Sequence, residues 1–371
     1  MSLTTPLCDL LSIEVPILQA GMGKAKGSPT TPELVAAVSE AGGLGCIGAV
    51  GLEPEELFEW IKTVRSLTSR PFAVDFLVPL APEGTEPTRN EIRAVIRRDH
   101  PEHWAFLDEL LDRYDLEPAS MDREGVFGND LARQQIEVTL DGEVPILVLG
   151  LGEATSVVQA AHARGSLVMA LAGAPRHARH HVAAGVDVVI AQGYEAGGHT
   201  GTIATFPLLP SVIDAVDPCP VVAAGGIADG RGMAAGLALG AQGVWCGTAF
   251  LFAKEANLAP EQRTQLINAN PDDLVVSTCY TGKPARIVKT SLIDDWKTSG
   301  LATLPMPYQH VLMDDFSLAA RRAGKWELVN NPAGQIAGIL HEIRPAADIV
   351  RDMVDEAEAV IDRLMNLKVL T

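Results

Sequence analysis

The chain has 371 residues, of which 47% are hydrophobic and 20% are charged, so it is long and apolar enough to bury a large core. It carries 29 lysine and arginine residues against 47 aspartate and glutamate residues, a formal net charge of −18 at pH 7. Such a surface repels the phosphates of nucleic acid and of anionic lipid, which argues against nucleic acid and membrane surfaces as partners. No run of about 18 apolar residues is present to span a bilayer.

The first residues, MSLTT, lack the basic and apolar regions of a signal peptide. The five cysteines are odd in number and widely spaced, and they include no Cys-x-x-Cys pair. They indicate neither a disulfide framework nor a cysteine zinc site, and we expect a cytoplasmic protein.

Short segments rich in Val, Ile and Leu recur along the chain, and most are followed by a helical pattern. They lack strict alternation of apolar and polar residues, as is typical of parallel strands buried on both faces. We predict eight strands, at residues 15–19, 44–47, 72–76, 145–149, 167–171, 187–191, 220–223 and 243–246.

Helix-compatible segments lie between most of these strands, and several end at a glycine where a helix is expected to stop. Eight strand–helix units in series predict an α/β fold of the (β/α)8 TIM-barrel type rather than an open doubly wound sheet. The predicted helices include residues 32–41, 54–66, 153–164 and 175–184, and the glycines are Gly42, Gly165, Gly185 and Gly240.

Two segments interrupt this rhythm. Residues 81–143, after the third strand, are charged and bear aromatic residues, and we predict helices inserted at the barrel rim. Residues 254–332, after the eighth strand, predict a smaller cap or substrate domain over the carboxyl ends of the strands. We therefore divide the chain into a barrel (1–253), this cap, and a final segment (333–371) whose helix at 344–367 returns to the barrel.

Active sites of such barrels lie on the loops that follow the strands. The sequence QAGMG (19–23) follows the first strand, and its glycines allow backbone amides to approach a flat ligand. Glycine-rich turns follow the seventh strand (AAGGIADG, 223–230) and the eighth (GTAF, 247–250). Turns at these two positions favour a phosphate site, and therefore a phosphorylated cofactor, over ordinary turn glycines.

The loop after the sixth strand, QGYEAGGHTG (192–201), places His199 among glycines. An imidazole is suited to take a proton from an activated substrate, whereas the alternative is a solvent-exposed loop histidine. His177, His180 and His181 lie on a predicted helix without an acidic or cysteine partner nearby, and we interpret them as a solvated helix face rather than a metal site.

These segments together resemble the nitronate monooxygenase family, formerly called 2-nitropropane dioxygenases, which includes FMN-dependent enoyl reductases and quinone reductases. The motifs follow in order along most of the chain. They are PILQAGM (16–22), TPELVAAVSEAGGLG (31–45), QGYEAGGHTG (192–201), PVVAAGGIAD (220–229), GTAF (247–250) and AGQ (333–335).

The resemblance implies an FMN-binding barrel in which His199 is the catalytic residue. The backbone of residues 20–22 would lie along the isoalloxazine, Asp75 would face the flavin edge, and the glycine turns would hold the phosphate. The implied cofactor-binding residues are Ala20, Gly21, Met22, Asp75, Gln192, Gly197, Gly198, Gly225, Gly226, Gly247 and Thr248.

Three positions depart from the pattern of relatives. Asp75 stands where Asn is frequent, and its carboxylate would disfavour a flavin anion unless it is protonated or paired. A lysine that ends the fifth strand in some relatives is replaced by Leu171-Ala172-Gly173. A hydroxyl residue found before the AGQ motif appears here as Asn330 or Asn331.

The resemblance implies oxidation of alkyl nitronates, and of nitroalkanes if His199 first removes the α-proton, by FMN and O2 to carbonyl compounds and nitrite. The alternative is an NAD(P)H-dependent FMN reductase of enoyl thioesters or quinones, and a third is a flavin-binding protein without turnover. We expect a small-molecule substrate and no metal, and homo-oligomerisation stays open.

Overall fold

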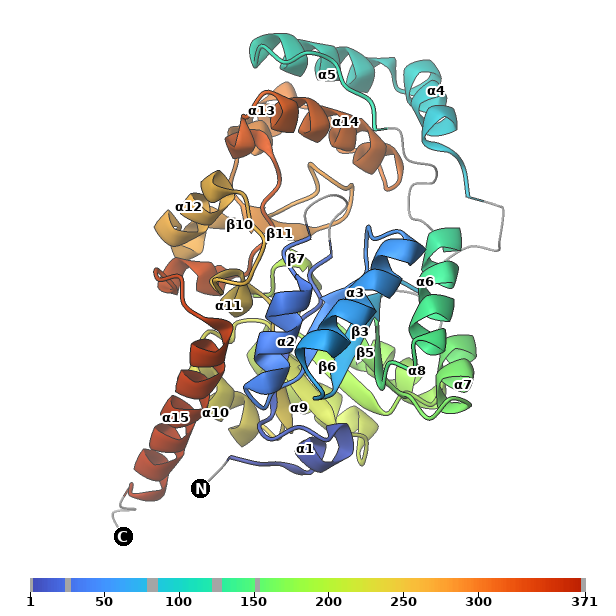
Figure 1. Ribbon diagram of the computed structural model, residues 1–371. Helices are drawn as coiled ribbons and strands as arrows, with labels where there is room; N and C mark the ends of the chain where they lie inside the picture. Colours follow the sequence, from blue (N-terminus) through green and yellow to red (C-terminus); the bar gives the residue numbers. More distant parts are fainter. Residues whose placement is uncertain (1–2, 24–27, 79–85, 122–128, 151–153, 368–371) are drawn as a thin grey trace.

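The structure of the protein, a computed structural model, is an eight-stranded barrel with a second group of helices and strands over one of its ends (Figure 1). No helix within the described part of the chain is long and apolar enough to cross a membrane. The structure describes residues 3–23, 28–78, 86–121, 129–150 and 154–367.

The barrel is one parallel sheet in the spatial order β1-β9-β8-β6-β5-β4-β3-β2. A bridge between Leu18 and Leu44 brings β1 beside β2, so that the sheet closes almost completely. This arrangement confirms the predicted (β/α)8 TIM-barrel fold and all eight predicted strands. Their bounds are β1 (Ile17–Gln19), β2 (Gly45–Gly48), β3 (Phe72–Phe76), β4 (Ile146–Leu149), β5 (Leu167–Ala172), β6 (Val188–Gln192), β8 (Val221–Ala224) and β9 (Gly243–Cys246).

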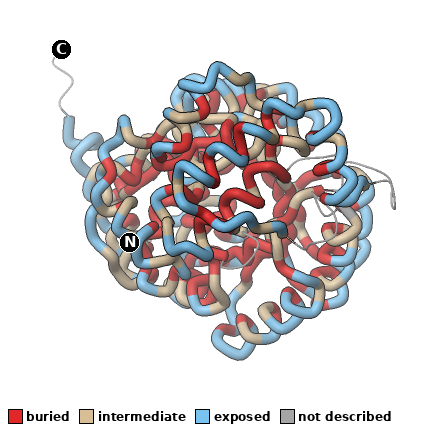
Figure 2. Tube along the Cα trace, turned by 90° about the horizontal axis from the view of Figure 1, so that it is seen from above, coloured by how far each residue is buried: buried red, intermediate tan, exposed pale blue. Residues whose placement is uncertain are grey.

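Successive strand residues are buried on opposite faces of this sheet. Leu18 and Val148 belong to a cluster inside the barrel, whereas their neighbours Ile17 and Leu147 pack with the surrounding helices. Because both environments are apolar, the strands show no hydropathic alternation in the sequence. Figure 2 shows the buried core enclosed by exposed elements.

Among the described residues, eight helices surround the barrel, and a short helix, α1 (Pro6–Leu11), contributes apolar side chains to the interior cluster. The last helix of the chain packs against both α10 and α2, and it thereby occupies the eighth place in the ring. The surrounding helices are α2 (Pro32–Glu40), α3 (Pro54–Leu67), α6 (Asn129–Asp141), α7 (Thr155–His162), α8 (Pro175–Ala183), α9 (Thr205–Val216), α10 (Gly230–Ala238) and α15 (Ala346–Met365).

Local sequence signals explain where several of these helices begin and end. Thr31 precedes α2, and its hydroxyl accepts a hydrogen bond from the Leu34 amide at 3.0 Å, while Pro32 occupies the first helical turn. The four glycines predicted as stops all have positive φ, which side chains other than glycine rarely adopt. The φ values are 90° for Gly42, 77° for Gly165, 94° for Gly185 and 101° for Gly240.

The elements over the carboxyl ends of the strands contain a small antiparallel sheet in the order β10-β11-β7. One of its strands, β7 (Gly198–His199), comes from the loop after β6, so the cap sheet includes the glycine–histidine motif. The other elements are α4 (Arg89–Asp99), α5 (Pro101–Arg113), α11 (Thr248–Leu251), α12 (Pro260–Asn268), η1 (Pro271–Asp273), β10 (Leu274–Ser277), β11 (Ala285–Val288), α13 (Ser291–Ser299), α14 (Tyr308–Arg322), η2 (Trp326–Leu328) and η3 (Gln335–Ile339).

The segment after β3, residues 81–143, contributes to two places in the structure. Helices α4 and α5 pack against α14 and share an apolar cluster with it, whereas α6 packs against α3 and β3 as a barrel helix. Ile96 and Phe316 are among the residues of the shared cluster. The division of the chain into three domains stays a prediction.

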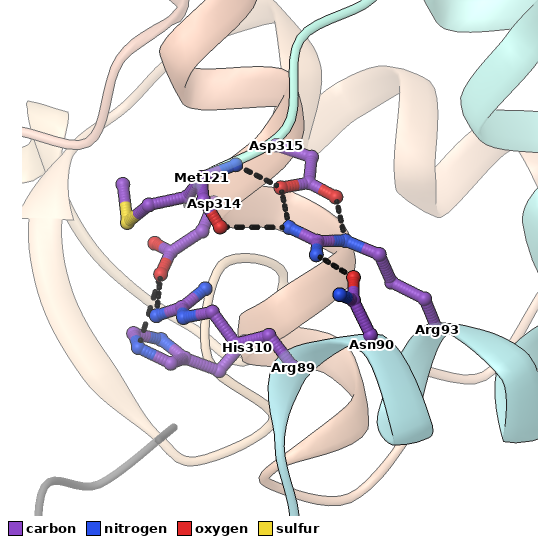
Figure 3. Close-up of polar contacts among 7 residues, drawn as sticks. All are labelled: Arg89, Asn90, Arg93, Met121, His310, Asp314 and Asp315. Carbon is purple, nitrogen blue, oxygen red and sulfur yellow. Dashed lines mark hydrogen bonds and ion pairs between the residues drawn. The ribbon is translucent and has the colours of Figure 1, made fainter. Parts of the chain in front are cut away.

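Ion pairs hold α4 on α14 (Figure 3). The Arg93 guanidinium donates from Nε and Nη2 to the two carboxylate oxygens of Asp315, both at 2.7 Å, and both side chains are buried. Asp314 accepts from Arg89 Nη2 at 2.8 Å and lies 3.3 Å from Nε2 of His310. A bidentate pair of this kind fixes orientation as well as distance.

Candidate active site

The predicted site residues all lie at or just after the carboxyl ends of β1, β3, β6, β8 and β9, the end that the cap covers. They fall into two contact groups. One group surrounds Gly21 and Gly247, and the other surrounds His199 and the glycine turn after β8. The two groups meet where Gly247 is followed by Thr248.

The first group is packed closely around Gly21. A Cβ atom on Gly21 would lie 2.5 Å from the Cβ of Asp75, so a larger residue cannot be accommodated without a shift. A Cβ built on Gly247 would lie 3.4 Å from the Ala20 methyl and 3.7 Å from the Met22 sulfur. The backbone of residues 20–22 therefore lies beside β3 and β9 with no side chain on its glycine.

Burial raises the pKa of the Asp75 carboxyl well above its ordinary value, which favours the protonated form. Burial also raises the pKa of the neighbouring Cys46 thiol, and the proximity of Asp75 adds to that increase. The raised pKa works against a carboxylate charge at this position, which weakens the objection that the sequence raised about Asp75.

The second group is built around β7. The side-chain amide of Gln192 donates to the carbonyl oxygen of His199 at 2.9 Å, and His199 pairs with Ala285 of β11. Gly198 has φ of 69°, and a Cβ built on it would meet no atom within 4 Å, so open space lies beside it. These contacts fix the backbone of the histidine and leave room next to it.

The His199 ring lies among groups from the cap. Its Nε2 atom is 3.1 Å from the Thr281 hydroxyl in the turn between β10 and β11. His199 is exposed to solvent, yet its pKa is lowered to about 4, mainly because the surrounding protein displaces water from the ring and in smaller part because of Lys283 and His310. His199 is therefore a neutral imidazole at neutral pH.

The turn after β8 packs against the loop that carries His199 and belongs to this group. Gly225 and Gly226 have φ of 89° and 78°, and the backbone N–H groups of Gly226 and Ile227 donate to no other described residue. Two adjacent amides of this kind can cradle an anion. By contrast, the first amides of α10 are already taken, because the carboxylate of Asp229 accepts from two of them. The backbone amides available for an anion are thus in the turn and not at the start of the helix.

The AGQ motif (333–335) packs against the same loop and against Thr248. The Gly334 amide donates to the Thr248 hydroxyl at 2.8 Å, and the Gln335 amide donates to the carbonyl oxygen of Glu195 at 3.1 Å. A Cβ on Gly197 would lie 2.6 Å from the backbone of Gly334, so glycine is required on the barrel side of this contact. The motif is therefore explained by backbone packing against the glycine–histidine loop.

Other residues singled out in the sequence lie apart from these two groups. Asn331 is buried, and its side-chain amide donates to the Gln262 carbonyl and to Gln265 of α12, both at 3.0 Å. On α8, His181 is buried against the Leu171 carbonyl at 3.0 Å, whereas His177 is exposed.

Sequence reasoning missed Thr281, Lys283 and His310, which approach His199 from the cap. The first two lie in the turn TGKP (281–284), whose glycine and proline are ordinary hairpin signals. That signal identifies a turn, but the pairing of β7 with β11, which brings this turn to His199, joins segments more than 80 residues apart.

The sequence matches the family model described as nitronate monooxygenase over residues 4–356. A protein of Mycobacterium tuberculosis named as a monooxygenase is 38% identical over 379 residues, covering 98% of this chain and 99% of the relative. A protein of Staphylococcus aureus named as a nitronate monooxygenase is 33% identical, covering 96% of this chain and 98% of the relative.

Two solved structures are similar over almost their whole length. The nitroalkane oxidase of Streptomyces ansochromogenes has a TM-score of 0.80 at 32% identity, covering 96% of this chain and 99% of its own. FabK from Thermotoga maritima has a TM-score of 0.75 at 32% identity, covering 98% of this chain and 99% of its own. These matches confirm the resemblance found in the sequence.

Proposed function

Because the chain belongs to the nitronate monooxygenase family, we propose that it binds FMN and uses O2 to oxidise alkyl nitronates and nitroalkanes to carbonyl compounds and nitrite. The observation that carries this proposal is the neutral imidazole of His199, held by contacts on its backbone and ring at the mouth of the barrel. A neutral imidazole at this position can accept the α-proton that a nitroalkane must lose.

The residues present fit an FMN. The backbone of residues 20–22 offers a surface that carries no side chain at Gly21, and the amides of Gly226 and Ile227 are available for a phosphate. The raised pKa of Asp75 disfavours a negative charge beside the ring. When bound, the flavin supplies the transfer of electrons from the substrate to O2.

The hydrogen bonds of Thr281 determine which nitrogen of His199 is the base. The Thr281 hydroxyl has a single proton, and the carbonyl oxygen of Lys283, 3.0 Å away, can only accept it. Toward His199 the hydroxyl must then accept, so Nε2 carries the hydrogen of the neutral ring. We infer that the lone pair is on Nδ1 and that Nδ1 takes the substrate proton.

Positive charge near the ring assists the anion that results. The positive charge of Lys283 disfavours the imidazolium form, and the same charge would stabilise a nitronate beside it. Proton abstraction leaves one added positive charge on His199 and one negative charge on the substrate. The attraction between these charges offsets part of the cost of protonating a base whose pKa is about 4.

A second candidate function is reduction of an enoyl thioester or a quinone with NAD(P)H as the electron donor. The similarity to FabK, at 32% identity over 98% of this chain, favours it. In that reaction the same flavin site would accept electrons from a reduced nicotinamide, and His199 would donate a proton rather than remove one.

Anaerobic mixing of the holoenzyme with each electron donor distinguishes the candidates. We expect a nitronate to reduce the flavin absorbance within the time of turnover, with NADH and NADPH having no effect. Rapid loss of absorbance with a reduced nicotinamide, and none with a nitronate, would replace the proposal by the reductase. A flavin that responds to neither would indicate a binding protein, and a chain that stays colourless when offered FMN would contradict all three.

A further inference from the structure

Two histidines and a glutamate gather where α4 ends and α5 begins. His100 lies between the two helices, and Glu102 and His103 lie in the first turn of α5. One ligand atom from each lies within 4.8 Å of the other two. His103 is buried, His100 is half-buried, and the Glu102 side chain is 54% exposed, so the group faces solvent on one side only.

The hydrogen bonds of His103 leave a lone pair directed at this group. Its Nε2 atom lies 2.8 Å from the carbonyl oxygen of Ala302, which can only accept, so Nε2 carries a hydrogen. In the neutral ring Nδ1 is then an acceptor, and it lies 3.2 Å from Oε1 of Glu102, which is also an acceptor. Two acceptors at this distance repel each other unless a proton or a metal ion lies between them.

We propose that His100, Glu102 and His103 bind one Zn²⁺, with water as the fourth ligand. Bonds of about 2.0 to 2.1 Å in a tetrahedron place two ligand atoms about 3.3 Å apart, close to the separation of His103 Nδ1 and Glu102 Oε1. The bond to Ala302 is the outer partner that metal-bound histidines usually have, since it fixes the ring and its tautomer. Two imidazoles and one carboxylate are a ligand set that suits zinc.

The charges around this group are compatible with a cation. The Arg97 guanidinium stacks on the Trp104 ring at 4.0 Å, and Arg98 pairs with Asp99 at 2.7 Å, so both nearby arginines already have partners. The end of α4 directs its carbonyl groups toward His100, which favours positive charge, although the start of α5 opposes it. The net charge of −18 favours cation uptake overall.

The site would connect α5 to the segment that supports Thr281. Ala302 is followed by Thr303, whose hydroxyl is 2.8 Å from that of Thr278, and the Leu304 carbonyl packs directly against Gly282. A metal on His103 therefore restrains a segment in contact with the turn that holds His199. The proposal concerns binding alone and does not depend on the reaction that the protein catalyses.

The test is a Zn²⁺ titration of the holoenzyme after treatment with EDTA, by equilibrium dialysis with metal analysis. We expect one Zn²⁺ per chain, and we expect Glu102→Gln and His103→Ala to weaken binding by about 10-fold or more. The Glu102 side chain is largely exposed, so that variant keeps its fold even if the loss of the buried His103 does not. Co²⁺ in place of Zn²⁺ should give the visible absorption bands of a tetrahedral site, and these should be lost in both variants.

His341→Gln is the matched control, because it removes an exposed histidine outside the group and should leave the affinity unchanged. Absence of stoichiometric Zn²⁺ uptake would overturn the proposal and leave His103 and Glu102 as a hydrogen-bonded ion pair. Unchanged binding in Glu102→Gln would also overturn it. So would loss of binding in His177→Gln, which would assign the metal to α8 instead.

Discussion

The hydroxyl of Thr281 lies 3.1 Å from Nε2 of His199 and 3.0 Å from the carbonyl oxygen of Lys283. Because that carbonyl takes the only hydroxyl proton, the histidine must donate to the threonine. Thr281 therefore acts as a positioning residue for His199. Thr281 comes from the cap, while His199 comes from a barrel loop. The tautomer of the proposed base therefore depends on contact between the cap and that loop.

Thr281→Val should lower kcat with a neutral nitroalkane by about 10-fold, because Nε2–H loses its acceptor and the Nδ1 lone pair is no longer specified. Thr281→Ser should restore activity, since the serine hydroxyl can make both contacts. The tautomer is checked by ¹⁵N NMR of the histidine rings, which should report Nε2–H in the unmodified protein. A ring that carries its hydrogen on Nδ1 would contradict the assignment, whatever the activity.

His199→Ala should retain bound FMN while proton abstraction from a neutral nitroalkane falls by about two to four orders of magnitude. Activity with a preformed nitronate should fall much less, because that substrate has already lost its proton. Steady-state rates with the two substrates, alongside the flavin absorbance of the variant, test this. An equal loss on both substrates would remove the base assignment.

The rate with a neutral nitroalkane should depend on pH through His199. The imidazolium has no lone pair to accept a proton, so the rate should fall as the pH drops below about 4 and stay level from there to neutral pH. Lys283→Gln removes a positive charge that lowers this pKa, and the acid limb should therefore move to higher pH.

Loss of contact with water is the larger cause of the low pKa of His199. The acid limb of the rate profile in Lys283→Gln should therefore stay below the ordinary imidazole pKa of 6.5. Lys283→Arg keeps the charge and is the control for this series. A limb that moves equally in the arginine variant would show that the charge of Lys283 is not responsible.

Asp75→Asn should stabilise the protein at neutral pH. The pKa of Asp75 is raised above 3.8 in the fold, so folding retains a proton that the unfolded chain releases, and stability is lost as the pH rises above about 4. Asparagine has no such proton to retain. The difference in melting temperature between the variant and the parent should therefore increase from pH 4 to pH 7, and a constant difference would show that Asp75 is ionised in the fold.

Arg93→Ala should lower the free energy of unfolding by about 3 kcal/mol, because it leaves the buried carboxylate of Asp315 without its partner. Arg98→Ala is the matched control on the same helix. Its pair with Asp99 is exposed to solvent, and its loss should have no measurable effect. Denaturant unfolding of the two variants makes the comparison. A similar, small effect in both would mean that the pair does not anchor α4 on α14.

The barrel was predictable because its strands are buried on both faces and are separated by glycines that end helices. Gly42 and Gly240, for example, mark helix ends that the structure places two residues earlier. The place of α6 was not predictable. It lies within a polar segment next to α4 and α5, and only packing against α3 identifies it as a barrel helix.

The candidate site was predictable where backbone geometry demands glycine, as at Gly21 and Gly225, since close approach and positive φ are visible as residue type. It was not predictable where ordinary side chains contribute through long-range contact. Thr281 carries no motif of its own. The role of Asp229 could have been found from the sequence, because aspartate just before a helix is a preferred N-cap residue whose carboxylate accepts from the first amides.

Helix α15 fills the gap between α10 and α2, and the peptide at Ala357 packs directly against Gly230. The ring of helices around the barrel is thus completed by a helix that follows the entire cap in the chain. As the polypeptide leaves the ribosome, all eight strands and every cap element emerge before α15, the helix that completes the ring around the barrel. A nascent chain halted anywhere in the cap would expose the apolar side of α10 to water. A stop codon in the cap would likewise leave that apolar face without the helix that covers it.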